Sequence, residues 1–276
     1  MPRIENWRKR EPIALVLTAA AAMVCVLAAG GQAPKSRNAS RHAATKTEEA
    51  KAAKPVTMPF RIGETLNFRV SWSAFSNAAS VQMTVPEQRD LYGYSTWHFR
   101  AQVHTVSPVR SLFSIDDQFD SYADRSTLDA RQYETHLDEL GKIQDQMFRF
   151  TAPGQAPRLP GPNIVVPAGT LDPLGALYVL RHVDWVHMPE FGGTIYDGHD
   201  LYAFSAKRQT TDENVTVGAG SFATTQVAID LYEHQKPVPG VHLVAWVAND
   251  DSRTPVLLQA QLPFGNIRAE LTSLSQ

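Results

Sequence analysis

One short segment, 170–181, predicts an α-helix in a chain whose other folded segments have the pattern of β-strands. Asp172 suits the N-cap position because its carboxylate can accept hydrogen bonds from the free N–H groups of the first turn. Pro173 suits the first helical position, where its missing N–H is not needed and its φ is already helical. The spacing i, i+3, i+4 and i+7 then places four side chains on one face: Leu174, Leu177, Tyr178 and Arg181.

The opposite side of this helix is also apolar, with Ala176, Val179 and Leu180. A helix that is apolar nearly all round is usually buried. We therefore expect it to pack inside or across a sheet, where it either fills space or gates a ligand site.

Apolar and polar residues alternate in most segments after residue 60. In 66–72 and 97–104 an apolar side chain recurs at every second position, which is typical of strands with one buried face. The Asp197-Gly198 pair predicts a tight hairpin turn. Together these signals predict about 11–13 strands. The predicted fold class is mainly β: a curved antiparallel sheet or partly closed β-barrel with one buried helix near 172–182.

The N-terminal segment 1–30 predicts export. Residues 1–12 are basic and polar, and an apolar run follows from Ile13 to Gly30, which is the order of a signal sequence. The run is long for a cleaved signal peptide and just long enough to span a bilayer. Both a cleaved signal and a single membrane anchor through 13–30 stay open, with lipidation at Cys25 as a third alternative.

The chain then divides into a linker and one domain. Residues 31–59 are rich in Ala and Lys and have no apolar periodicity, which predicts a disordered linker. Residues 60–276 are the expected exported β domain. The predicted location is the periplasm, where the protein is soluble after cleavage or anchored to the inner membrane by its N-terminus.

Charge separates the tether from the domain. Residues 1–59 carry ten basic and four acidic side chains, whereas the remainder carries sixteen basic and twenty-four acidic ones. An acidic domain argues against nucleic-acid binding. The basic tether is either a solvated linker or a segment that lies on anionic lipid headgroups. The domain has no cysteine, so it contains no disulfide and no thiolate ligand or nucleophile.

The sequence contains none of the common catalytic motifs. Around Ser221 the second glycine of a nucleophile elbow is missing. There is no H-E-x-x-H, phosphate-binding loop or dinucleotide glycine pattern. We therefore expect a non-enzymatic protein without a cofactor.

Two groups of polar residues remain as candidates for a functional or structural role. His182, His187 and His199 lie near several carboxylates and are candidate metal ligands, although they also fit ordinary loop positions after the helix. Asp250 and Asp251 predict a hairpin turn, which we expect an Asp250–Arg253 ion pair to fix. His98 and His104, on one face of a strand, are expected to be solvated.

Several short motifs occur in order: F-x-x-G-E at 60–64, D-x-L-x-A-L-Y-x-L-R at 172–181, and W-x-A-x-D-x-x-R-x-P-V at 246–256. In this order they resemble an uncharacterised domain-of-unknown-function family of bacterial exported, periplasmic β-rich proteins. The resemblance covers residues 60–274. It implies a curved or partly closed sheet in the bacterial envelope, similar to lipid-carrier-like β folds, and brings no catalytic residues.

An apolar ligand is the favoured functional hypothesis. Residues expected to line its cavity, or alternatively to be ordinary core, are Trp72, Trp97, Leu174, Tyr178 and Trp246. The predicted function is a non-enzymatic cell-envelope protein that binds a lipid or another apolar molecule in the concavity of the sheet. The alternatives are a metal-dependent envelope enzyme using the histidines, and a structural or cell-wall interaction module.

Overall fold

The computed structural model describes residues 58–156 and 163–275. Over these residues the chain forms fourteen strands in one sheet, one α-helix and a short 3-10 helix. The predictions for 1–30 and for most of 31–59 lie outside the described residues. The elements are β1 (Thr65–Trp72), β2 (Phe75–Leu91), β3 (Tyr94–Thr105), η1 (Val109–Ser111), β4 (Asp116–Asp124), β5 (Ala130–Glu139), β6 (Lys142–Thr151), β7 (Ile164–Val165), α2 (Pro173–His182), β8 (Glu190–Tyr196), β9 (Leu201–Val217), β10 (Gly220–Glu233), β11 (Lys236–Pro237), β12 (His242–Ala248), β13 (Pro255–Leu262) and β14 (Gly265–Ser275).

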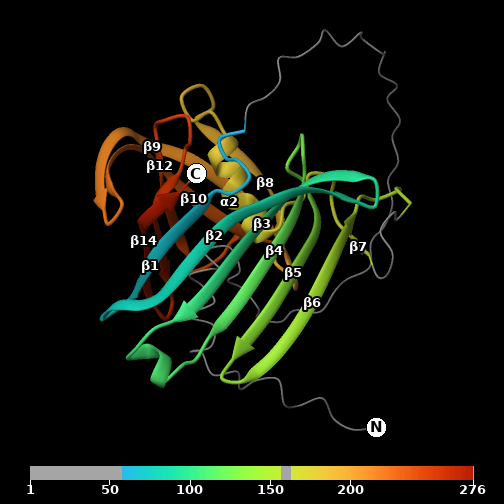
Figure 1. The fold of residues 1–276 in the computed structure, drawn as a ribbon. Helices are drawn as coiled ribbons and strands as arrows, with labels where there is room; N and C mark the ends of the chain where they lie inside the picture. Colours follow the sequence, from blue (N-terminus) through green and yellow to red (C-terminus); the bar gives the residue numbers. More distant parts are fainter. Residues whose placement is uncertain (1–57, 157–162, 276) are drawn as a thin grey trace.

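The sheet follows the chain order almost throughout. Its path is β7-β6-β5-β4-β3-β2-β1-β14-β13-β12-β10-β9-β8, with β11 paired to β10. The first and last long strands, β1 and β14, pair in the middle, and the whole sheet curves around α2 (Figure 1). It does not close into a barrel, because β8 and β7 are its two free ends. The predicted mainly β, curved antiparallel class is confirmed.

Strand β2 is longer than its sequence indicates. Pro86 lies within this strand, although proline has no N–H for a strand ladder. The observed strand continues to Leu91, and its register with β3 shifts between Thr84 and Glu87. The irregularity places the proline where the regular ladder is interrupted.

The inner face of the sheet carries the main apolar core. Successive strands contribute residues such as Phe68, Val81, Phe99, Leu258 and Leu271, all buried. Helix α2 packs against this face at β3 and β4 and also contacts β8. Its residues Pro173 to Arg181 are all buried, which confirms the expected buried helix. No helix in the described ranges is both long and apolar enough to cross a membrane.

The segment before α2 bridges the edge strand β8 and strand β5, which lies two strands in from the other edge. The N–H of Leu171 donates to Thr194 O (2.9 Å), and its carbonyl accepts from Tyr196 N (3.0 Å), both on β8. On the other side, Ala130 N of β5 donates to Thr170 O (3.1 Å). We call residues 170–172 the seam segment. It connects strands that the ladder itself does not join.

Candidate functional site

The N-terminus of α2 is held by a buried carboxylate. Asp172 caps the helix by accepting from Gly175 N at Oδ1 (2.8 Å), and its Oδ2 accepts from Ser121 Oγ of β4 (2.6 Å). Burial raises the pKa of Asp172 to about 6, although the hydrogen bonds from Gly175 and Ser121 oppose that rise. The predicted N-cap is confirmed, and the cap also attaches α2 to the sheet.

The C-terminal end of α2 is held by a fully buried ion pair. Arg181 Nη1 lies 2.5 Å from Glu64 Oε1, and Nη2 lies 2.9 Å from Oε2. The same Nη2 donates to the carbonyls of Pro59 (3.0 Å) and Ser252 (2.9 Å). Arg181 therefore joins the helix to the start of β1 and to the β12–β13 turn.

The β12–β13 turn is stabilised differently from the prediction. Asp250 Oδ1 accepts from Ser252 N (3.0 Å), Ser252 Oγ (2.6 Å) and Arg253 N (3.2 Å). The Arg253 guanidinium instead donates to His182 O (2.9 Å) and Val183 O (3.4 Å), the last carbonyls of α2. The expected Asp250–Arg253 ion pair is wrong, because the unpaired carbonyls at the helix end attract the arginine.

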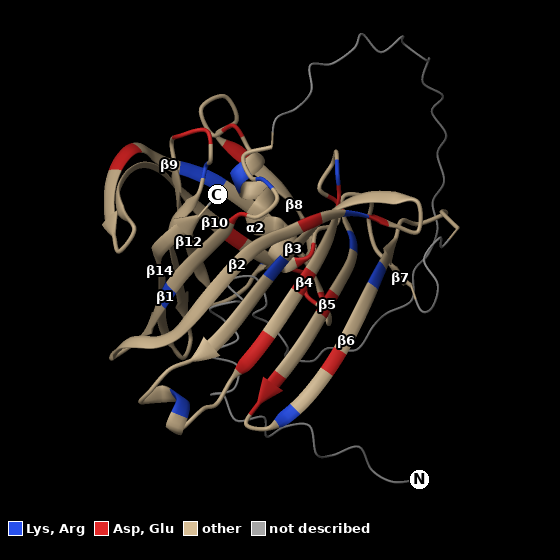
Figure 2. Ribbon diagram, in the orientation of Figure 1, with Lys and Arg blue, Asp and Glu red and all other residues tan. Residues whose placement is uncertain are grey.

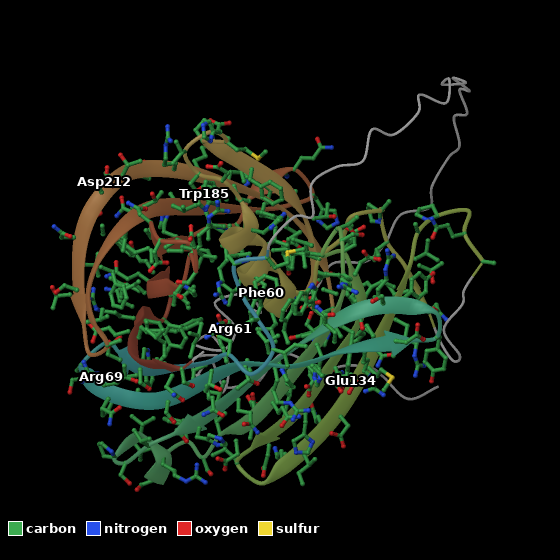
Figure 3. All side chains as sticks on the ribbon, turned by 45° about the horizontal axis from the view of Figure 1, so that its top comes forward. Phe60, Arg61, Arg69, Glu134, Trp185 and Asp212 are labelled. Carbon is green, nitrogen blue, oxygen red and sulfur yellow. The ribbon has the colours of Figure 1, made fainter. Side chains whose placement is uncertain are left out.

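Aromatic rings gather at this end of the helix. Tyr178 stacks on Phe99 with ring centroids 3.7 Å apart, and Phe60 meets Tyr178 edge-on at 5.2 Å. Phe60 also meets Trp97 edge-on at 5.1 Å. In Figure 3, Phe60 and Arg61 are labelled in the centre of the view, beside α2.

A cleft of about 500 Å³ opens beside these rings, which we call the rim cleft. Phe60 and Trp97 supply its aromatic wall, and Glu64 lines it next to the buried ion pair. Three exposed charged residues and one amide also line it: Arg61, Arg125, Asp251 and Gln88. A volume of this size is typical of small-molecule sites.

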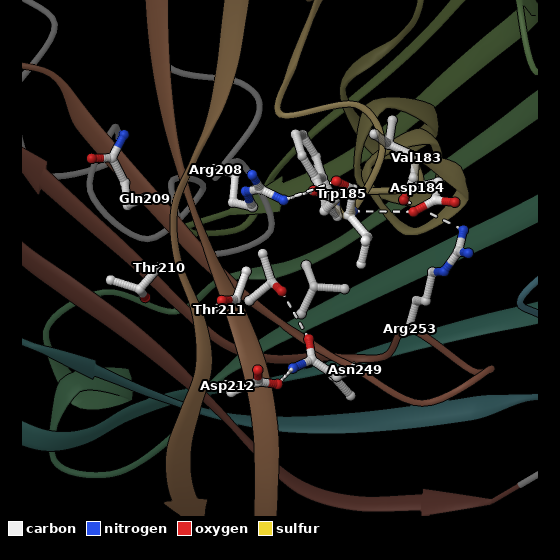
Figure 4. A pocket seen from close by; sticks show the side chains of 14 residues that line it. Val183, Asp184, Trp185, Arg208, Gln209, Thr210, Thr211, Asp212, Asn249 and Arg253 are labelled. Atoms are coloured by element: carbon white, nitrogen blue, oxygen red, sulfur yellow. Dashed lines mark hydrogen bonds between the residues drawn. The ribbon is translucent and has the colours of Figure 1, made fainter.

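A second cleft, of about 670 Å³, lies on the other side of the β12–β13 turn; we call it the β9 cleft (Figure 4). It is lined mainly by polar residues, among them Arg208, Thr210, Thr211, Asp212, Asn249 and Arg253. Asn249 donates to Asp212 (2.8 Å) and accepts from Thr225 (2.8 Å). The register of β9 with β10 shifts twice in this region, and such bulges often lie next to functional sites.

The structure divides the predicted apolar-ligand residues among three places. Leu174 and Tyr178 of α2 and Trp97 of β3 belong to the main core. Trp72 lies at the other end of β1 from Glu64, stacked on Phe75 at 5.9 Å. Trp246 belongs to a separate apolar cluster with Val256 and Leu257, and its indole N–H donates to Glu213. These five residues therefore do not line one cavity.

The three histidines do not form the predicted metal site. His187 is exposed and bonds to Asp184 in its own turn (2.8 Å). His182 is the last residue of α2, where burial lowers its pKa. His199 lies in the β8–β9 turn, where its backbone N–H donates to Asp197 Oδ1. Among the described residues, no three His, Cys, Asp or Glu side chains are grouped in a way that could hold a metal.

A polar cluster on the outer face of the sheet was not predicted. His98 was expected to be solvated, but it is buried, stacks on Tyr122 (4.6 Å) and bonds to Asp120 Oδ1 through Nε2 (2.5 Å). Burial alone would raise the pKa of Asp120, but hydrogen bonds from His98, Arg100 and Gln118 hold it below its usual value. A signal for this cluster was present in the sequence, because polar residues alternate in both 98–104 and 116–120. When two such strands pair, their polar side chains lie side by side on one face.

Acidic residues also gather at the start of β4 and the end of β5, shown in red in Figure 2. Among them, Asp117 is buried, and its Oδ1 accepts from Asp138 N (3.0 Å). Its Oδ2 has no hydrogen-bond partner in the described part of the chain. Burial, aided by the charge of Glu139, raises the pKa of Asp117 to about 7. No pocket described above includes it.

Structural comparison supports the fold. The β-barrel-like protein of domain of unknown function DUF1849 from Brucella abortus has a TM-score of 0.50 at 11% identity; the match covers 77% of this chain and 96% of that one. A candidate lipoprotein from Parabacteroides distasonis has a TM-score of 0.39 at 11% identity, with 80% of this chain and 100% of that one covered. At 11% identity the likeness to the Brucella abortus protein shows the fold alone.

Sequence comparison identifies the family. No curated protein matches the chain. One family model, described as a protein of unknown function, DUF3108, matches residues 67–272, and this description names no reaction. The matched range includes nearly all of the sheet, the whole of α2 and the β12–β13 turn. The chain therefore belongs to the DUF3108 family of proteins of unknown function.

Proposed function

We propose that the protein is a non-catalytic, exported protein of the bacterial envelope that binds a lipid or another apolar molecule at the rim cleft. The observation that carries this proposal is the aromatic wall formed there by Phe60 and Trp97. Aromatic side chains provide large apolar contact areas for a ligand. The apolar run at 13–30 supports export.

The architecture supports binding rather than catalysis. The concavity next to β3 and β4 is occupied by α2 itself, so the ligand site lies at the helix end and not beneath the helix. The ion pair of Arg181 with Glu64 fixes the two elements that border the rim cleft. A rigid, preformed cleft lowers the entropic cost of binding.

Native mass spectrometry of the protein purified from its own host tests this proposal. We expect an apolar molecule that leaves on denaturation and that organic extraction identifies. Gln88→Trp should reduce the occupancy of this molecule. Gln88 lines the cleft next to Trp97, its pairing partner on β3, and the larger ring would fill the space. Gln82→Trp is the control, since Gln82 is exposed and pairs with Gln102 on the outer face. A ligand-free spectrum from the native host would refute the proposal.

The β9 cleft favours a second candidate function, recognition of a polar cell-wall component. Its threonine hydroxyls and the Asn249 amide suit a ligand with many hydroxyl groups. Sedimentation with purified cell-wall sacculi is the corresponding test. Wild-type protein should sediment with the sacculi, whereas Thr211→Trp should remain in the supernatant; no sedimentation of the wild type would exclude this candidate.

A further inference from the structure

We propose that the ligand of the rim cleft is an anionic amphiphile, and that Arg61 and Arg125 bind its carboxylate or phosphate headgroup. This inference rests on the proposed function, because it names the chemical class of the molecule bound there. It goes further by assigning a charge to that molecule and a role to two residues outside the aromatic wall.

Two arginines at the rim cleft have no described partner. Both are exposed and line the rim cleft. Neither guanidinium has a hydrogen bond or an ion pair within residues 58–156 and 163–275. Many other arginines of the sheet and helix do pair with carboxylates: Arg69, Arg100, Arg110, Arg131 and Arg181. Two guanidiniums at one cleft thus have no partner among the described residues, and we infer that they are available for a ligand.

The charge balance of the lining also favours an anionic ligand. Two carboxylates, Glu64 and Asp251, also line the rim cleft. Glu64 is already paired with Arg181 and buried. Among the described lining residues, this leaves the single carboxylate of Asp251 against the two guanidiniums of Arg61 and Arg125, an excess of positive charge. Guanidiniums bind carboxylate and phosphate oxygens through two parallel hydrogen bonds.

One indole N–H at the rim cleft has no acceptor among the described residues. Trp97 is only 7% exposed, lines the rim cleft, and its Nε1 has no hydrogen-bond partner in the described structure. A buried donor left unpaired is costly, so such groups usually meet a partner. This N–H has almost no accessible surface of its own, so an oxygen atom of an anionic headgroup would supply the acceptor only after a small shift of the side chains around it. The same indole provides apolar surface with Phe60, which suits the tail of the same molecule.

Binding of two matched probes to the purified full chain tests this inference. Oleate and oleyl alcohol share one apolar tail and differ in headgroup charge. We expect oleate to bind at least about tenfold more tightly below its micellar concentration, because charge-assisted hydrogen bonds are the stronger ones. Inorganic phosphate alone should bind weakly. Tight phosphate binding that is unaffected by oleate would overturn the amphiphile assignment.

Two sets of variants assign the effect to residues. Arg61→Gln with Arg125→Gln should remove the preference for oleate while binding of oleyl alcohol persists. Lys142→Gln with Lys236→Gln is the control, because it removes the same charge from exposed positions outside the rim cleft. Trp97→Phe should weaken oleate binding without loss of folding, since its N–H has no described partner to lose.

The outcomes separate the two proposals. If neither probe binds the wild-type protein, the proposed function fails and this inference fails with it. If both probes bind equally, or if the arginine variants retain the preference for oleate, only the charge assignment fails. If the lysine variants lose the preference as well, net charge rather than the rim cleft is responsible, and the assignment to Arg61 and Arg125 is wrong.

Discussion

Arg181 and Glu64 illustrate how a single buried pair can hold several elements together. Both side chains are essentially without solvent contact, at 0% and 1% exposure. Removing one partner of such a pair leaves an uncompensated buried charge, whereas exposed pairs contribute little. The effect of a substitution should therefore depend on burial rather than on the chemistry of the pair.

Glu64→Gln and Arg181→Gln should each lower the free energy of unfolding by about 3–5 kcal/mol. The matched control is Arg69→Gln, because Arg69 and Glu270 are also an Arg–Glu pair but Arg69 is 51% exposed. That control should change stability by less than about 1 kcal/mol. Urea denaturation of the three variants measures the difference. Equal losses in all three would show that burial does not decide the contribution of the pair.

Asp117 should make stability depend on pH. Burial raises its pKa to about 7 in the folded protein, above the value of about 4 that an unfolded carboxyl group has. The folded state thus keeps the proton over an interval in which the unfolded chain releases it. The contribution of Asp117 to the free energy of unfolding is therefore highest below this interval and falls as the pH rises through it.

Asp117→Asn should remove this particular loss. Relative to the wild type, the variant should gain stability between about pH 4 and pH 7, by no more than about 4 kcal/mol. Other carboxylates titrate in both proteins and cancel in the comparison. The measurement is the free energy of unfolding of each protein across this range. Parallel pH profiles would mean that Asp117 is ionised at neutral pH in the folded state.

At the scale of elements, α2 depends on its contacts at both ends. The apolar side chains of α2 explain why the helix is buried, whereas Asp172 and Arg181 determine where it lies on the sheet. Asp172 joins the first turn to Ser121 of β4, and Arg181 joins the last turn to Glu64 before β1. A ten-residue helix is only marginally stable in isolation. It therefore depends on these contacts, which also set its position.

Asp172→Ala should destabilise the protein by about 2 kcal/mol, because it removes the helix cap and leaves the Ser121 hydroxyl without its partner. Asp172→Asn should cost less, since the amide oxygen can still accept from Gly175 N. Ser121→Ala separates the tie to the sheet from the cap itself. Thermal unfolding of the three variants gives the order. An alanine variant as stable as the asparagine variant would show that the cap is unimportant.

At the scale of the whole molecule, the sheet is open and the seam segment connects its edge strand β8 to β5. Within 58–156 and 163–275, a few hydrogen bonds at Thr170 and Leu171 link β5 to β8. In contrast, strand β1 pairs with β14 from Thr65 to Trp72, with one register shift between Asn67 and Phe68. Regions with few supporting hydrogen bonds open at lower free energy than continuous ladders.

The amides of Leu171 and Tyr196 should therefore exchange with solvent before those of Val70 and Ala269, which lie in the paired centre of β1 and β14. Hydrogen exchange under native conditions, followed by mass spectrometry or NMR, measures this order. Equal protection at the seam segment and in the centre would show that the molecule opens as one unit.

Local signals in the sequence determined the helix and most strands. The α2 limits follow from an N-cap, a proline and apolar spacing that act within about four residues of each other. The hairpins at Asp197-Gly198 and Asp250-Asp251 likewise depend on neighbouring residues. The family motifs at 60–64, 172–181 and 246–256 could be located in the same way, and they converge at one end of α2.

The tertiary structure alone decided which residues meet. Glu64 and Arg181 are 117 positions apart, and the burial of His98 depends on the register of β3 with β4. Trp246 and Trp97 look alike in an alternating pattern, yet they belong to different apolar clusters. Alternation shows that a strand has two faces, but it does not show which neighbours cover each face. The rim cleft, with Arg61 from before β1 and Arg125 from after β4, exists only because the folded sheet brings those segments together.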